Sequence, residues 1–163
     1  MVPTPPEEIM SFVTETDLPT GAGRPVWQVL IVDDEPDVHQ ATALALNNVA
    51  IEGRHIEFIH AYSAAEARSC LAEHEDIAVV LLDVVMESPD AGLQLVRHIR
   101  EELRNHALRV ILRTGQPGYA PEIETIRSYD INDYKTKSEM TRVRLFTSLT
   151  VAIRSYWQIH QLE

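Results

Sequence analysis

The chain has 163 residues, of which 45% are hydrophobic and 24% are charged, and this composition excludes wholesale disorder and a fibrous repeat. The length allows one domain with a tail or linker rather than two full domains. Fourteen Lys and Arg against 25 Asp and Glu give a formal net charge of −11, which argues against unaided binding to nucleic acid.

Residues 1–25 hold five of the chain's nine prolines and show no sustained periodicity. This composition predicts an N-terminal tail, in which Glu7 to Val13 could form a short helix. The N-terminus lacks the pattern of a secretory signal, and no apolar run approaches the length of a membrane span. The single cysteine, Cys70, excludes an internal disulfide and a cysteine-based zinc site. We therefore expect a cytoplasmic protein.

From residue 26 onward, short apolar runs alternate with amphipathic stretches of helical length. The predicted strands are Gln28–Val32, Glu57–Ala61, Ala78–Leu82, Arg109–Leu112 and Ile131–Tyr134. The predicted helices are Pro36–Asn48, Ala64–Glu73, Ala91–Leu103, Pro121–Tyr129 and one from Thr141 to the end. This alternation predicts one α/β domain over residues 26–150, with a doubly wound, five-stranded parallel sheet. Ser63 and Glu66 have the spacing of a capping box, which predicts the second helix start.

Polar groups follow the predicted strands at the edge where ligands bind in such sheets. Asp33 and Asp34 follow the first strand, and Asp83 follows the continuously apolar third strand. The run Asp33 to Asp37 alone could be a solvated turn before a helix that starts at Pro36. With Asp83 beside it, three carboxylates would repel one another unless a cation held them, and Mg2+ is favoured.

Two more groups at this edge suit phosphoryl chemistry. Thr114 ends the fourth strand and Lys137 follows the fifth. They would supply a hydroxyl and a fixed positive charge to the same phosphoryl group, because phosphoryl transfer depends on charge neutralisation.

The ordered combination of Leu30-Ile-Val-Asp-Asp-Glu-Pro36, Asp83, Thr114 and Tyr134-x-x-Lys137 resembles the receiver domain of bacterial two-component response regulators. The likeness covers about Val26 to Leu149 and implies a flavodoxin-like fold. It implies a phosphoryl acceptor served by a histidine kinase or phosphotransfer protein, and an output domain in the full-length chain. The roles implied are Asp83 as acceptor, Asp33, Asp34, Asp83 and the Val85 carbonyl as Mg2+ ligands, Thr114 and Tyr134 as the switch pair, and Lys137 as the phosphoryl contact.

The chain departs from the family pattern at several points. Met-Pro is missing after the acceptor, Lys-Pro is missing in the fifth strand, and the loop before Gly92 is one residue longer than usual. Lys135 could be taken for the phosphoryl-contacting lysine, but Lys137 keeps the Tyr-x-x-Lys spacing. The resemblance further implies that the side chains two residues past the acceptor and two past the switch threonine border the path of a hydrolytic water. Here these are Val85 and Gln116, of which only Gln116 can hydrogen-bond the water.

Three stretches of sequence further resemble the N-terminal receivers of HD-GYP-type cyclic di-GMP phosphodiesterase regulators. They are the residues around Asp83, Leu112 to Pro117 and Asp130 to Lys137. None of the seven histidines is followed by aspartate, so the chain lacks the motif of that output domain. The chain itself is expected to be a phospho-acceptor signalling domain rather than an enzyme.

The last predicted helix has an apolar seam with 4-3-4-3 spacing, made of Leu145, Leu149, Ala152, Tyr156 and Ile159. Up to Ala152 the seam is the core face. Beyond Ser155 we expect a homodimer contact or a linker, so residues 151–163 form an extension towards an output domain absent from this chain. Trp27 and Trp157 are expected to pack, the histidines to be surface or core residues, and Arg113 to pair with a local acid.

Two other functions stay open. A haloacid dehalogenase-like aspartyl-phosphate phosphatase also uses a strand-end aspartate and Mg2+, but it requires Asp-x-Asp where this chain has Asp33-Asp34-Glu35. The other is a receiver-like interaction module that is never phosphorylated, which the presence of all the acids with Thr114 and Lys137 disfavours.

Overall fold

A computed structural model of the chain describes residues 25–115, 122–137 and 141–162. The predicted tail, including Glu7 to Val13, lies outside the described residues. The elements in chain order are β1 (Val26–Val32), α2 (Pro36–Ala45), β2 (Ala50–Ile51), β3 (Arg54–Ala61), α3 (Ala64–Glu73), β4 (Ile77–Asp83), α4 (Ala91–Arg97) with a π-helical continuation (His98–Glu102), β5 (Arg109–Thr114), α5 (Ile123–Ser128), β6 (Asp133–Thr136) and α6 (Arg142–Gln161).

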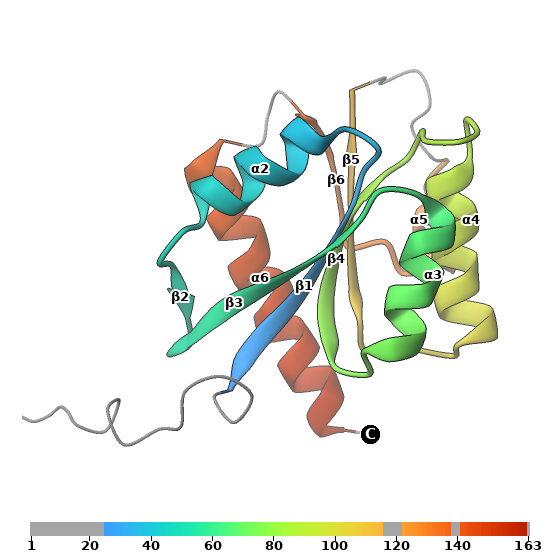
Figure 1. The fold of residues 1–163 in the computed structure, drawn as a ribbon. Coiled ribbons are helices and arrows are strands. Elements are labelled where there is room, and N and C mark those ends of the chain that lie inside the picture. The colour runs from blue at the N-terminus through green and yellow to red at the C-terminus, as the bar shows by residue number, and fades with distance from the viewer. Residues whose placement is uncertain (1–24, 116–121, 138–140, 163) are drawn as a thin grey trace, which may run out of the picture.

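The strands form one sheet in the order β2-β3-β1-β4-β5-β6. The pairs from β3 to β6 are parallel, and β2 adds a short antiparallel edge. Helices α2 and α6 cover one face, and α3, α4 and α5 cover the other (Figure 1). The doubly wound, flavodoxin-like fold is therefore confirmed. The count of five strands is wrong by one, because Ala50–Ile51 is too short to show a strand pattern.

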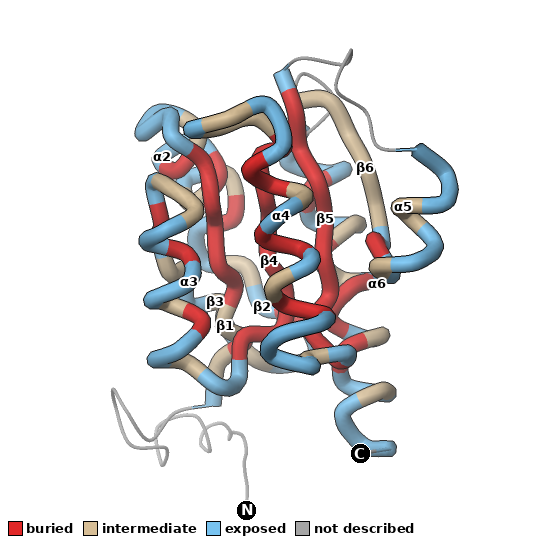
Figure 2. Tube along the Cα trace, turned by 90° about the vertical axis from the view of Figure 1, so that its right-hand side faces the viewer, coloured by how far each residue is buried: buried red, intermediate tan, exposed pale blue. Residues whose placement is uncertain are grey.

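The core consists of two apolar layers, one on each face of the sheet. All seven residues of β4 and all six of β5 are buried, as Figure 2 shows along both strands. Strands covered by helices on both faces read as continuous apolar runs, so the apolar Ala78–Leu82 marked a central strand correctly. The two central strands end at Asp83 and Thr114, and their burial fixes where those polar side chains lie.

Helix boundaries follow local chemistry where the sequence offers it. The Ser63 hydroxyl accepts a hydrogen bond from the Glu66 amide at 3.1 Å, which confirms Ser63 as the N-cap and the start of α3. The Glu66 carboxylate accepts the amide of Tyr62, at 2.8 Å, and not that of Ser63 as a capping box would require. Pro36 opens α2 as predicted, but that helix ends at Ala45 rather than Asn48. The predicted last strand lies two residues further along, at Asp133–Thr136.

Two further predicted helices differ from the observed ones. The helix expected from Ala91 to Leu103 changes to π-helical geometry at His98. There the buried Arg100 donates hydrogen bonds to the main-chain carbonyls of Asn105, Leu108, Tyr129 and Asp130. The helix expected from Pro121 covers only Ile123–Ser128, and Pro121 itself lies outside the described residues.

The second half of α6 packs on the sheet further than predicted. Tyr156 is buried with Leu145, Leu149 and Ala152, and Ile159 packs against the same layer. Tyr156 therefore belongs to the core and not to a contact with a second copy, whereas the homodimer contact expected beyond Ser155 stays a prediction. The core of the domain extends past residue 150, to Tyr156.

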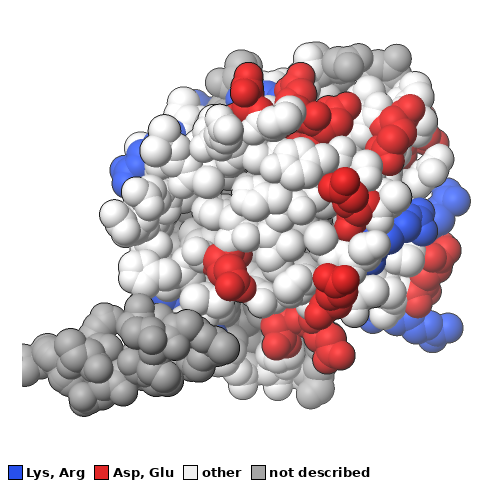
Figure 3. Space-filling model, in the orientation of Figure 1, with Lys and Arg blue, Asp and Glu red and all other residues white. Residues whose placement is uncertain are grey.

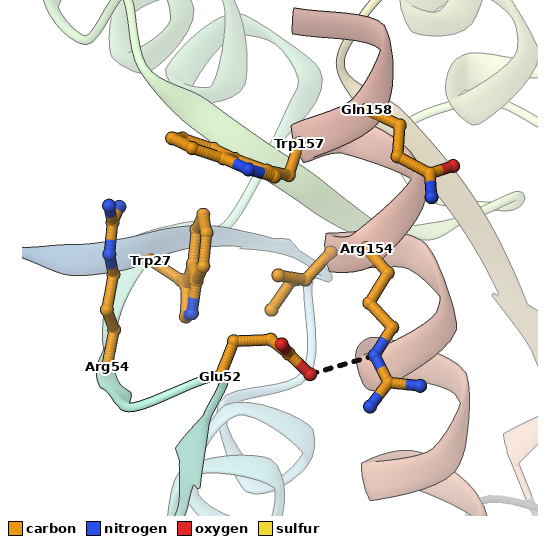
Figure 4. A pocket seen from close by; sticks show the side chains of 7 residues that line it. Trp27, Glu52, Arg54, Arg154, Trp157 and Gln158 are labelled. Atoms are coloured by element: carbon orange, nitrogen blue, oxygen red, sulfur yellow. Dashed lines mark hydrogen bonds and ion pairs between the residues drawn. The ribbon is translucent and has the colours of Figure 1, made fainter. Parts of the chain in front are cut away.

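A cavity of about 430 Å³ lies beside this part of α6, at the start of β1 (Figure 4). Trp27 and Trp157 meet edge to face there with ring centroids 6.0 Å apart, which confirms their packing role. Arg54 lies 4.5 Å from the centre of the Trp27 ring, and Arg154 pairs with Glu52 at 2.8 Å. These contacts hold the end of α6 on the sheet, at the edge opposite the predicted acidic site.

Candidate functional site

Three carboxylates meet where β1 and β4 end. Asp33 and Asp83 are buried and Asp34 is exposed. One oxygen from each lies within 4.8 Å of the others. The Asp33 Oδ1 atom accepts the Glu35 amide at 2.9 Å, which fixes the turn into α2. The chemistry of these donors fits a hard divalent cation, because Mg2+ prefers carboxylate oxygens.

Lys137 supplies the positive charge at this cluster. Its Nζ atom lies 3.1 Å from Asp33 Oδ2, 3.0 Å from Glu35 Oε1 and 3.3 Å from Asp83 Oδ2. Burial lowers the pKa of Lys137, but hydrogen bonds to Glu35 and Asp33 outweigh that effect and leave this pKa above its ordinary value. Lys135 is directed elsewhere and pairs with Asp133 at 3.9 Å. The Tyr-x-x-Lys spacing therefore identified the lysine that reaches the acids.

Without a bound cation, the site disfavours the ionised form of the Asp83 carboxyl. Burial, with the nearby charge of Asp33, raises its pKa from 3.8 to about 6, although Lys137 and the Val85 amide favour the ionised form. The Val85 amide donates to Asp83 Oδ1 at 3.3 Å. A bound cation would remove the repulsion between the acids, so metal binding and ionisation of Asp83 support each other.

The acids open into a pocket of about 280 Å³ at the surface. Its lining residues are Asp34, Glu35, Asp83, Val85, Met86, Gly115 and Lys137. This volume accommodates a hydrated cation and a small anionic group together. Acidic side chains also stand along the upper edge of the molecule in Figure 3.

The predicted switch residues border the site at β5 and β6. Thr114 is fully buried at the end of β5, one position beyond the pairing of Asp83 with Arg113. Tyr134 is half-buried in β6 and packs against the core layer beneath α4 and α5. The sheet therefore brings both residues to the site's edge, whereas Gln116 lies outside the described residues.

Sequence reasoning missed the functions of Gly92 and Glu35. A Cβ atom at Gly92 would lie 2.3 Å from the Asp83 carbonyl oxygen and 2.8 Å from Val84 Cα. Only glycine lets the start of α4 approach the loop that follows β4, where the Gly92 amide donates to the Val84 carbonyl at 2.9 Å. A glycine shortly after a buried strand is the available signal. The sequence shows Glu35 only as part of an acidic run, but in the structure Glu35 forms an ion pair with the same lysine, Lys137, as the buried acids.

Arg113 does not form the expected ion pair. Its Nη1 atom donates to the Thr42 hydroxyl at 2.9 Å, and the structure shows no ion pair for it within residues 25–115, 122–137 and 141–162. The side chain is buried, at 3% exposure.

A doubly wound sheet with clustered acids and a lysine at its carboxyl edge defines a receiver-type domain. The family model for the response regulator receiver domain matches residues 29–149, and the chain belongs to this family.

Comparison with known proteins supports this assignment. The chain is 49% identical over 137 residues to the 3'3'-cGAMP-specific phosphodiesterase 2 of Vibrio cholerae, a match that covers 84% of this chain and 26% of that protein. The chain thus spans about a quarter of that relative. A chemotaxis protein CheY homolog of Campylobacter jejuni is 26% identical over 110 residues, which cover 68% of this chain and 80% of the homolog.

The fold agrees with solved structures. A response regulator receiver domain protein from Clostridium thermocellum aligns with a TM-score of 0.69 at 22% identity, covering 82% of this chain and 99% of the other. Among the helices of the described residues, none is long and apolar enough to cross a lipid bilayer.

Proposed function

We propose that this receiver domain accepts a phosphoryl group on Asp83 from a histidine kinase or phosphotransfer protein, in a Mg2+-dependent reaction. The observation that carries this proposal is the meeting of Asp83 with two further carboxylates and the Lys137 ammonium in one open pocket. A phosphoryl acceptor needs an open path, an anionic oxygen and nearby positive charge. Asp83 lines the open pocket beside Lys137, and a bound cation would favour its ionised form.

In the reaction, an Asp83 carboxylate oxygen forms a bond to phosphorus while the bond from phosphorus to the donor nitrogen breaks. The leaving imidazole keeps the electron pair and takes a proton. Lys137 lies close enough to Asp83 to turn to the phosphoryl oxygens and balance their charge. Asp33, Asp34, Asp83 and the Val85 carbonyl would hold Mg2+, which supplies further charge neutralisation when bound.

Thr114 and Tyr134 would change conformation in response to the new charge on Asp83. Thr114 moves towards the phosphoryl oxygens and Tyr134 turns inwards, which alters the surface of α5, β6 and α6. Structures with and without a phosphoryl mimic test this step. An unmoved Tyr134 would contradict it.

The output controlled by this switch lies outside the chain. The Vibrio cholerae relative is named as a phosphodiesterase for 3'3'-cGAMP, and this chain matches only a quarter of it. We propose that the full-length protein hydrolyses a cyclic dinucleotide under control of the receiver. A homodimer through the exposed face of α6 stays a prediction.

Incubation with Mg2+ and a small phosphodonor, followed by intact mass measurement, tests the proposal. Wild type should gain one phosphoryl group and Asp83→Asn should gain none. Steady release of phosphate from phosphate monoesters would favour the phosphatase, and an unmodified chain would favour the interaction module. Asp34→Ala should weaken Mg2+ binding more than the neighbouring control Asp37→Ala, and equal losses would show that the metal site is misplaced.

The phosphorylated state should be long-lived. Val85 cannot hydrogen-bond an attacking water, and positioning of such a water changes rates by one or more powers of ten. Val85→Asn should therefore speed the loss of phosphate. A variant that decays no faster than wild type would contradict this account.

A further inference from the structure

Arg113 lies directly beneath the acidic site. It pairs with Asp83 in the register of β4 and β5, so both side chains leave the sheet on the same face. Its guanidinium borders a crevice of about 130 Å³ between α2 and α6. Lys137 lines this crevice and also the acidic pocket above it. Lys137 therefore borders both the crevice beside Arg113 and the open site.

The guanidinium is held at one end only. Its Nη1 atom donates to Thr42 Oγ1 at 2.9 Å, and the Thr42 hydroxyl donates its own proton to the Val38 carbonyl at 2.8 Å. The Nε and Nη2 atoms have no hydrogen-bond acceptor in the described part of the chain, although the side chain is 3% exposed. Buried donors without acceptors are costly, so their presence calls for an explanation.

The charges of the nearby acids explain why a guanidinium can be buried at position 113. Burial lowers the pKa of Arg113, and the charges of Asp33 and Asp83 oppose this effect, so the guanidinium stays positive. Four carboxylates, those of Asp33, Asp34, Glu35 and Asp83, then face two cations, Lys137 and Arg113. Phosphorylation of Asp83 replaces a single negative charge with a phosphoryl group that carries more.

We propose that Arg113 is a positioning residue, which forms an ion pair with Asp33 in place of Lys137 when Lys137 turns to the phosphoryl group. The inference rests on the proposed function, because it assigns a second cation to the same reaction. Lys137 lies 3.1 Å from Asp33 Oδ2, and that contact is lost when its Nζ atom moves to the phosphoryl oxygens. The free Nε and Nη2 donors then replace it, while Thr42 keeps the guanidinium on α2.

The test compares Arg113→Met, Arg113→Lys and wild type at pH 8.5, where Asp83 is ionised. Arg113→Met should bind Mg2+ more tightly, by roughly fivefold, because a cation near the metal is removed. The same variant should be phosphorylated at least about tenfold more slowly at saturating Mg2+. Arg113→Lys should restore both values towards wild type, since it keeps the charge.

Arg109→Met is the matched control. Arg109 is also buried in β5 on the same face, but it pairs with Asp130 at the other end of the strand. This variant should leave Mg2+ affinity and phosphorylation rate unchanged, with folding of each variant checked by circular dichroism.

Opposite changes in the two readouts separate a charge effect from damage to the site. If Arg113→Met lowers both Mg2+ affinity and phosphorylation rate, or changes neither, the inference is overturned. Wild type that binds Mg2+ but is never phosphorylated overturns the proposed function and this inference together. Wild type that is phosphorylated beside an Arg113→Met variant with the same rate overturns the inference alone.

Discussion

Replacing Asp83 with Asn should stabilise the metal-free protein at neutral pH, although it removes the proposed acceptor. The Asp83 pKa is raised from 3.8 to about 6, chiefly by burial and then by Asp33. At about 1.4 kcal/mol for each tenfold change in proton affinity, ionised Asp83 costs the fold about 3 kcal/mol. The amide has no charge to bury, so Asp83→Asn should raise the free energy of unfolding at pH 7.5 by about 2–3 kcal/mol.

The pH dependence of this difference follows from the sign of the pKa change. A carboxyl whose pKa is higher in the folded state stabilises the fold fully below its unfolded pKa near 4. That contribution is lost as the pH rises through about 6. Wild type and Asp83→Asn should therefore differ little near about pH 3.5 and diverge mainly between about pH 4 and 6.

Urea denaturation of both proteins in chelator, from about pH 3.5 to 8, measures the difference. Saturating Mg2+ should shrink or reverse it, because the cation binds wild type better and stabilises it. An Asn variant no more stable than wild type at pH 7.5 in chelator would refute the claim that burial and Asp33 together disfavour the ionised form of Asp83.

The remaining predictions concern other residues. Gly92→Ala should cost about 1–3 kcal/mol by urea denaturation and slow phosphorylation, since its Cβ collides with the Asp83 carbonyl; unchanged values would show that the loop adapts freely. Arg100→Met should cost about 3 kcal/mol, because four main-chain carbonyls lose a donor, whereas the exposed control Arg127→Met should cost under about 0.5 kcal/mol. Burial, then His39, lowers the pKa of His60 from 6.5, so stability should fall as the pH drops below 6.5. His60→Gln should flatten that profile between pH 5.5 and 7.5, and a slope equal to that of wild type would exclude this histidine as its source.

The sequence predicted the fold well because burial leaves a direct pattern. The apolar run ending at Asp83 marked the central strand, and Ser63 with Glu66 marked a helix start. It failed where tertiary contacts decide the structure. Two residues, Ala50–Ile51, pair with β3 as an edge strand, and Arg100 binds distant carbonyls beside a π-helical turn that no local propensity predicts.

The sequence predicted which residues form the candidate site but not all of the contacts that their side chains make. Strand-end positions were enough to bring Asp33, Asp83 and Lys137 to one edge of the sheet. The direction of Arg113 was not predictable, because its hydroxyl partner, Thr42, lies 71 residues away in the chain and gives no signal of that contact. Tyr156 was misplaced for a similar reason, since the length of the sheet covered by α6 depends on the packed structure.

The central claim is that Asp83 itself becomes the acyl phosphate. Borohydride reduction of an aspartyl phosphate converts that aspartate to homoserine, which marks the modified position permanently. After incubation with Mg2+ and a small phosphodonor, peptide mass spectrometry should find homoserine at position 83 and unmodified aspartate at positions 33 and 34. Homoserine at position 33 or 34, or at none of the three, would contradict the account.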